Sequence, residues 1–260
     1  MKEDFQNFIF NTLNGTVDKL RGNATAFEKK LKTFSDNVDG SFSMPQAHFD
    51  SSSSNLEPRY RELSGSLATL VTSLPLVQVG YKQWNITFAG WWQAPPPFGP
   101  MVVVSAAEPL QREAKLSIKT KKLSDLTKIL SVASSPSDKA IWEFLKSAMP
   151  NWQHQDFVAN ELLERELWMK LPKVRAGTIE LDRICTVTSN ESDLARMIFS
   201  DWKAREAYLR LAPRSEFLIN GSRDLITLVV HSTAEEADLK DALEFFKSLL
   251  DRSQKLHLSR

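Results

Sequence analysis

The chain has its clearest structural pattern at residues 215–246, which read SEFLINGSRDLITLVVHSTAEEADLKDALEFF. Two short runs in this stretch, 215–219 and 225–231, have the apolar and β-branched composition that is typical of strands. Asn220 and Gly221 stand between the two runs, and both residues tolerate the positive φ angles of a tight turn. The pattern therefore predicts a β-hairpin.

A helix is predicted directly after this hairpin. Thr233 and Glu236 have the spacing of a capping box, in which each side chain bonds a backbone N–H at the start of a helix. Apolar residues then recur every three or four positions, as they do on one face of a helix. This face would consist of Leu239, Leu243, Phe246 and Leu250.

The region before the hairpin extends the pattern towards the N-terminus. Residues 178–189 are rich in Ile, Val and Thr and predict a strand. Asn190 can cap a helix over 191–211, and Asp193 has the position from which a side chain reaches back to the cap. We therefore expect the order β-α-β-β-α over residues 173–260.

Residues 178–250 resemble poorly characterised bacterial domains that are often found beside membrane-spanning helices as non-catalytic accessory modules. The resemblance is carried by a strand that leads into a helix beginning Asp193-Leu194-Ala195-Arg196, followed by a strand hairpin and a final helix. It implies a non-catalytic module, and it assigns no functional residue. No stretch of this chain approaches the 18 apolar residues that a membrane span requires.

The middle of the chain predicts a β-meander followed by helices. Residues 77–92 (VQVGYKQWNITFAGWW) alternate apolar and polar residues and predict one long strand. Prolines between positions 95 and 100 prevent both helix and ladder hydrogen bonding. Two further strands are expected at 101–106 and 114–121, and helical patterns fill 123–171.

The N-terminal part is expected to be helical and tethered. Residues 1–36 have apolar residues at helical spacing and predict one or two helices. Residues 37–58 form a Ser-rich linker, and a short helix is expected at 60–74. Two further regions follow, an α+β subdomain over 59–172 and the subdomain over 173–260. The predicted fold class is α+β, an antiparallel sheet of five to six strands covered by helices on one face.

Composition excludes several classes of site. The formal net charge of +1 gives no overall attraction to nucleic acid or to an anionic membrane. The single cysteine, Cys185, excludes internal disulfides and thiolate zinc sites. The nine glycines are too far apart to form a glycine-rich phosphate loop. We expect no cofactor, no metal and no DNA partner, and the lack of a leader-like N-terminus predicts a cytoplasmic protein.

The first candidate surface is the segment around the proline run. Trp91, Trp92, Pro96 and Phe98 combine large aromatic side chains with a chain stiffened by proline. Such a loop loses little entropy on binding, and Trp is enriched at binding hot spots. We therefore expect an adaptor that binds a protein partner here. The alternative is that these aromatic residues serve the core.

The second candidate surface is a group of basic residues along one predicted strand. They are Arg112, Lys115, Lys119, Lys121 and Lys122. A flat cationic strand face can hold the phosphates of lipid headgroups or RNA. The alternative is an ordinary solvated face or edge, where lysine prevents strand-to-strand association.

An enzyme remains the third hypothesis, in the form of a hydrolase with an unrecognised site. His154 lies near Asp156 and Glu161 and is the best candidate for a general base. Cys185 lies in an apolar run, where burial would suppress the reactive thiolate. Because no motif joins these residues, the sequence favours a non-catalytic protein.

Overall fold

The computed structural model describes residues 2–44, 75–91, 100–107, 114–121, 171–220 and 225–257. The helices predicted at 60–74 and over most of 123–171 lie outside the described residues, as does most of the Ser-rich linker.

The described residues form helices and one nine-stranded sheet, which confirms the α+β class. The strands are β1 (Ser41–Ser43), β2 (Leu76–Tyr81), β3 (Trp84–Trp91), β4 (Met101–Ala107), β5 (Lys115–Thr120), β6 (Lys173–Val174), β7 (Cys185–Ser189), β8 (Ser215–Asn220) and β9 (Leu225–Val230). The helices are α1 (Lys2–Asn37), α6 (Ile179–Ile184), α7 (Leu194–Phe199), α8 (Trp202–Leu211), the short 3₁₀ helix η2 (Ala212–Arg214) and α9 (Glu236–His257).

The sheet has more strands than the five to six predicted. Its order is β1-β2-β3-β4-β9-β8-β5-β7-β6. Two of the additional strands, β1 and β6, have only three and two residues, too few for periodicity to reveal. The chain divides into two compact units, Met1–Val104 with His231–Leu239, and Ser105–Val230 with Lys240–Arg260.

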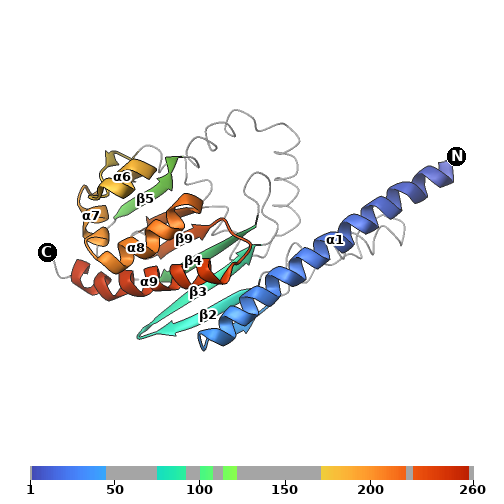
Figure 1. Ribbon diagram of the computed structural model, residues 1–260, viewed down its shortest axis with the longest axis horizontal. Helices are drawn as coiled ribbons and strands as arrows, with labels where there is room; N and C mark the ends of the chain where they lie inside the picture. The colour runs from blue at the N-terminus through green and yellow to red at the C-terminus, as the bar shows by residue number, and fades with distance from the viewer. Residues whose placement is uncertain are drawn as a thin grey trace. The chain divides into compact units, whose positions relative to one another are not determined.

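The first unit is built on α1, β2 and β3. Phe27, Leu31 and Phe34 of α1 are buried, and the Phe34 ring lies edge-on to Phe88 of β3 at 4.9 Å between centroids. Figure 1 shows the C-terminal half of α1, in blue, beside these strands, while its N-terminal half extends past them. α1 is unbroken from Lys2 to Asn37, so this region forms one helix rather than two.

The single strand predicted over 77–92 is wrong, because this segment folds into the β2–β3 hairpin. Tyr81 pairs with Trp84, and the turn at Lys82 has a positive φ of 54°. The burial pattern changes parity across the turn, from Val77 and Val79 to Trp84, Ile86 and Phe88. That change of parity was the sequence signal that would have located the turn.

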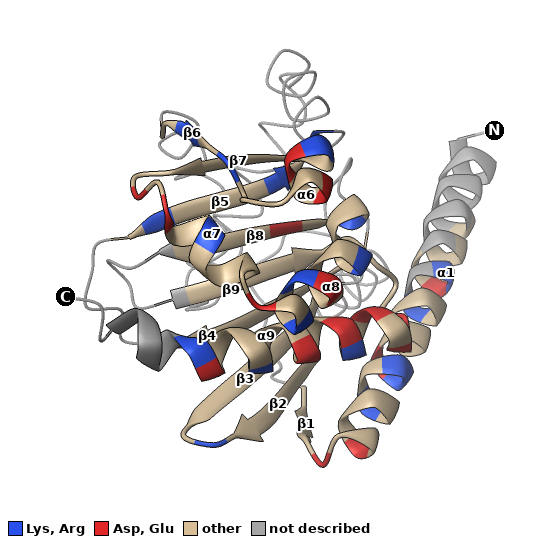
Figure 2. Cartoon of the chain, turned by 60° about the vertical axis from the view of Figure 1, so that its left-hand side comes forward, with Lys and Arg blue, Asp and Glu red and all other residues tan. Residues whose placement is uncertain are grey.

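The second unit places helices on one face of β5, β7, β8 and β9, as Figure 2 shows for α7, α8 and α9. Phe217 of β8 meets Phe245 of α9 at 4.9 Å and Tyr208 of α8 at 6.1 Å between ring centroids. Phe199 of α7 joins the same cluster, 5.3 Å from Tyr208. These buried aromatic rings form the core of the unit.

The position of β5 differs from the predicted meander. β5 pairs antiparallel with β8 on one side and with β7 on the other, so it is a central strand that does not neighbour β4. The β8–β9 hairpin itself is confirmed, with Asn220 paired to Leu225. The loop between these two residues lies outside the described part of the chain.

Two predictions within residues 178–211 are wrong. The first half of the predicted strand is α6, whose N-cap Thr178 accepts a hydrogen bond from the Leu181 N–H. The single predicted helix over 191–211 is two helices, because Asp201 starts α8 by accepting from the N–H groups of Lys203 and Ala204. The side chain of Asn190 caps no helix and instead accepts from the Lys115 N–H.

Candidate functional site

The Trp- and Pro-rich segment begins and ends on described residues of the first unit. Trp91 is the last residue of β3, while Trp92, Pro96 and Phe98 lie outside the described residues. The chain returns at Met101, the first residue of β4, and β3 and β4 are neighbours in the sheet. Neighbouring strands thus hold both ends of a nine-residue connection, Trp92 to Pro100.

The strand end that precedes this segment is fixed by close packing. The Gly90 N–H donates to the Pro75 carbonyl at 2.8 Å. A Cβ at Gly90 would collide with the Leu31 and Phe27 side chains of α1, so only glycine allows this approach. The chain therefore leaves β3 from a rigid position against α1.

One lysine of the predicted basic stripe is neutralised by a carboxylate within the sheet. Lys119 forms a 2.6 Å ion pair with Glu216, the residue directly opposite on β8. Both side chains are mostly buried, with 14% and 6% exposure. Because successive residues of a strand point to opposite faces, this pair lies on the face opposite Phe217 and the helices.

The remaining basic residues are less available than the sequence predicted. Lys121 donates from Nζ to the carbonyls of Asp182 and Arg183, at the C-terminal end of α6. A lysine there satisfies carbonyls that have no partner within the helix and complements the helix dipole. Lys115 is half-buried on β5, and Arg112 and Lys122 lie outside the described residues.

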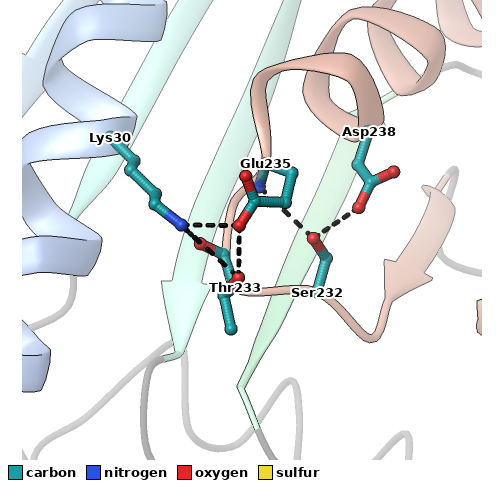
Figure 3. A network of polar contacts seen from close by, with 5 residues as sticks. All are labelled: Lys30, Ser232, Thr233, Glu235 and Asp238. Atoms are coloured by element: carbon teal, nitrogen blue, oxygen red, sulfur yellow. Dashed lines mark hydrogen bonds and ion pairs between the residues drawn. The ribbon is translucent and has the colours of Figure 1, made fainter.

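A polar network that the sequence did not predict joins α1 to the start of α9 within the first unit (Figure 3). Lys30 donates from Nζ to Glu235 Oε1 at 2.6 Å and to the Thr233 carbonyl at 3.2 Å. Thr233 Oγ1 in turn donates to Glu235 at 2.7 Å. The Lys30 hydrogen bonds lower the pKa of the Glu235 carboxyl below its ordinary value.

The same network replaces the predicted capping box. Ser232, rather than Thr233, accepts from the Glu235 N–H at 3.3 Å, and its hydroxyl donates to the buried carboxylate of Asp238. Ala234 adopts a left-handed φ of 58° between them. These contacts order the residues just before α9 and join them to α1. The side chains of the network bond one another, so no bound ligand is needed to explain the arrangement.

The buried thiol and phenol of the second unit are unsuited to nucleophilic chemistry. Burial raises the pKa of Cys185 to about 12, so the thiol remains protonated at neutral pH. Burial also raises the pKa of Tyr208 well above its usual value, and its hydroxyl is 3.5 Å from the Ile118 carbonyl. His154, the predicted general base, lies outside the described residues.

Two large apolar side chains are strongly exposed in the described part of the chain. Ile179 in the first turn of α6 is 84% exposed, and Trp202 in the first turn of α8 is 57% exposed. The Trp202 ring also lies 5.9 Å from the Lys203 ammonium. Exposed Trp and Ile side chains are candidates for contact with other molecules.

Comparison with known proteins found no matching family model, no matching curated protein and no matching solved structure. The resemblance of residues 178–250 to bacterial accessory domains therefore stays a prediction. Within the described ranges, no group of three His, Cys, Asp or Glu side chains is placed to hold a metal ion. No described helix combines the length and the apolar character needed to cross a membrane.

Proposed function

We propose that this chain is a non-catalytic adaptor that binds a protein partner through the segment from Trp91 to Pro100. The observation that carries the proposal is the anchoring of this segment between the end of β3 and the start of β4, which are neighbouring strands in the sheet and both lie in the first unit at these points. Connections between adjacent antiparallel strands usually have about two to five residues. This one has nine, and it contains Trp92, Phe98 and four prolines.

The physical argument is one of entropy and contact area. Proline restricts the unbound chain, so less conformational entropy is lost when a partner binds. Tryptophan supplies a large contact area and is enriched among the residues that dominate binding energy. The close packing of Gly90 against α1 gives the segment a fixed origin on the protein.

The two alternative functions have weaker support. Anionic lipid or RNA would have to bind the basic strand without two of its lysines. Lys119 is paired with Glu216, and Lys121 bonds the carbonyls of α6. A hydrolase would need an activated nucleophile or base, and the described Cys185 is held in its protonated form.

The test is affinity capture from the native host with the wild type and with Trp91→Ala/Trp92→Ala, identified by mass spectrometry. We expect a partner that binds the wild type and is lost from the double variant. Trp202→Ala is the matched control, because it removes a tryptophan that is exposed and lies in the second unit. It should retain the partner.

Thermal unfolding followed by circular dichroism would show that each variant is folded. Trp92→Ala/Phe98→Ala replaces the first variant if the loss of Trp91 from the end of β3 lowers stability. A partner that binds the wild type and both double variants equally would contradict the proposal. So would a partner that is lost only with Trp202→Ala.

A further inference from the structure

The helix α6 in the second unit has only six residues, and side-chain hydrogen bonds hold both of its ends. Thr178 caps its first turn, and Asp182 Oδ1 accepts from the Ala176 N–H at 2.6 Å. The Lys121 ammonium bonds its last carbonyls at 3.2 and 2.8 Å. Isolated helices of this length are unstable in water, so these contacts are what keep α6 formed.

The four residues on the outer surface of α6 are Ile179, Glu180, Arg183 and Ile184. At 100° per residue they occupy one contiguous arc of the helix, and Leu181, which is fully buried, lies on the inner side. Ile179, Glu180 and Arg183 are exposed and Ile184 is half-buried. The cap contacts therefore hold a fixed surface with an isoleucine at each end and opposite charges between them.

The pattern of this surface is self-complementary. When two copies of α6 lie antiparallel across a two-fold axis, Glu180 is level with Arg183 of the second copy, and Ile179 is level with Ile184 of the second copy. The two-fold axis therefore creates two equivalent ion pairs, each between Glu180 of one copy and Arg183 of the other. We propose that this face of α6 associates with the same face of a second copy of the chain.

The charges favour this occupant over others. The described residues provide no ion pair for the Glu180 carboxylate or the Arg183 guanidinium, so both remain available. An anionic bilayer, a nucleic acid or a strongly acidic peptide would gain no net attraction here, because Glu180 repels an anion as strongly as Arg183 attracts it. A second copy satisfies both charges at once.

The expected affinity follows from the size of the contact. Two six-residue helices bury far less than the roughly 1,600 Å² of a standard stable interface. The dimer is therefore weak and reversible, and it is expected to form as the protein concentration rises.

The experiment is sedimentation equilibrium of the full chain at concentrations up to about 0.5 mM, where weak association becomes measurable. We expect the wild type to dimerise. Glu180→Arg or Arg183→Glu should each weaken the dimer about tenfold or more, because each variant turns two attractive pairs into repulsive ones. The double variant Glu180→Arg/Arg183→Glu restores opposite charges and should regain the wild-type affinity to within about threefold.

Two further variants complete the design. Ile179→Ser keeps both charges and removes the exposed apolar side chain, so it should also weaken the dimer. Trp202→Ser removes an exposed apolar residue from α8 and should leave association unchanged. All changed side chains are exposed, and circular dichroism would verify that each variant folds.

Three results would overturn the proposal. One is a wild type that stays monomeric over the whole concentration range. Another is a dimer that is insensitive to either single charge reversal. The third is a double variant that associates no better than the single variants, since this would show that the two charges do not face each other across the interface.

Discussion

The ion pair between Lys119 and Glu216 shows how one residue can lose the role that its charge suggests. Lys119 shares its strand with Lys115 and precedes Lys121, but its ammonium is 2.6 Å from a carboxylate that is only 6% exposed. Taking both charges out of water has a large desolvation cost, which their mutual attraction offsets only while both are present. The pair is therefore a structural feature of the β5–β8 ladder.

This geometry predicts that Lys119→Met destabilises the protein by about 3 kcal/mol, because it leaves the Glu216 carboxylate buried without its cation. Urea unfolding would measure the free energy of unfolding. The double variant Lys119→Met/Glu216→Leu should recover most of the loss, since well-packed apolar residues can replace a buried pair. A double variant less stable than Lys119→Met alone would contradict this account.

Cys185 predicts a pH dependence of stability. Its pKa is raised from the ordinary value of 9.0 to about 12 in the folded protein. Above pH 9 the unfolded thiol loses its proton while the folded thiol keeps it, so the unfolded state is favoured. Stability contributed by this group is complete below pH 9 and declines by about 1.4 kcal/mol per pH unit above it, until about pH 12.

The measurement is the free energy of unfolding of the wild type and of Cys185→Ala between pH 7 and 10. Burial raises the pKa of Tyr208 as well, so Tyr208 adds a decline to both proteins as the pH approaches 10, and the charge of the Cys185 thiolate enlarges that decline in the wild type only. The wild type should therefore lose more stability than Cys185→Ala above pH 9. Parallel curves for the two proteins would show that the thiol does not titrate as described.

At the scale of elements, the contact between α1 and β3 depends on one missing side chain. A Cβ at Gly90 would overlap Leu31 and Phe27, both buried in α1. Gly90→Ala should therefore destabilise the first unit by about 1–3 kcal/mol, the usual cost of overpacking. Gly80→Ala in β2 is the matched control, because nothing lies within 4 Å of a Cβ there.

Thermal melts of the two glycine variants would test this prediction, and hydrogen exchange would show whether α1 loses protection. An equal melting temperature for Gly90→Ala and Gly80→Ala would show that α1 yields to the added methyl group without cost. The Gly90 contact would then not be what fixes the end of β3.

The break between α7 and α8 rests on Asp201. Its carboxylate accepts from two N–H groups at the start of α8 and forms an ion pair with Arg252 of α9 at 3.2 Å. Asp201→Ala should therefore cost about 1–2 kcal/mol of stability, the upper range for a lost N-cap. Asp201→Asn keeps a capping oxygen and loses only the charge, so chemical denaturation should place it between the wild type and Asp201→Ala.

At the scale of the whole molecule, stability depends on buried aromatic contacts more than on surface charge. Phe245 meets Phe199, Tyr208, Phe217 and Phe246 within 6.4 Å between ring centroids. Phe245→Ala removes contacts from three helices and a strand, and we expect a loss of about 3–5 kcal/mol. Ile179→Ala, at an exposed position, should change stability by less than about 0.5 kcal/mol.

Calorimetry would compare these two variants with the wild type. A small effect of Phe245→Ala would mean that the aromatic cluster can collapse around the space that the ring leaves. A large effect of Ile179→Ala would mean that the outer face of α6 contributes to the stability of the fold. The stability of the Glu180→Arg and Arg183→Glu variants would then have to be measured before their dimerisation is compared.

The local pattern of the chain was sufficient for the α+β class, for the β8–β9 hairpin and for the apolar face of α9. In each case the pattern lies within a single element or a single hairpin. The spacing of the apolar residues therefore shows directly which side of the element is buried. The same reasoning failed at residues 77–92 and 178–189. At 77–92 the turn is marked only by a change in the parity of the alternation, which is easily missed within one apolar run. At 178–189 the β-branched composition does not distinguish a strand from a short helix held by its caps.

The pairing of β5 with β7 and β8, the Lys119–Glu216 ion pair and the Lys30–Glu235 contact arise only in the folded chain. Lys30 and Glu235 are 205 residues apart in the sequence, and no local preference of either residue indicates the other. Such contacts depend on which distant strands and helices bury the most apolar surface together. For that reason, composition and spacing predicted the kinds of elements, while tertiary packing determined which charges are buried and which surfaces are exposed.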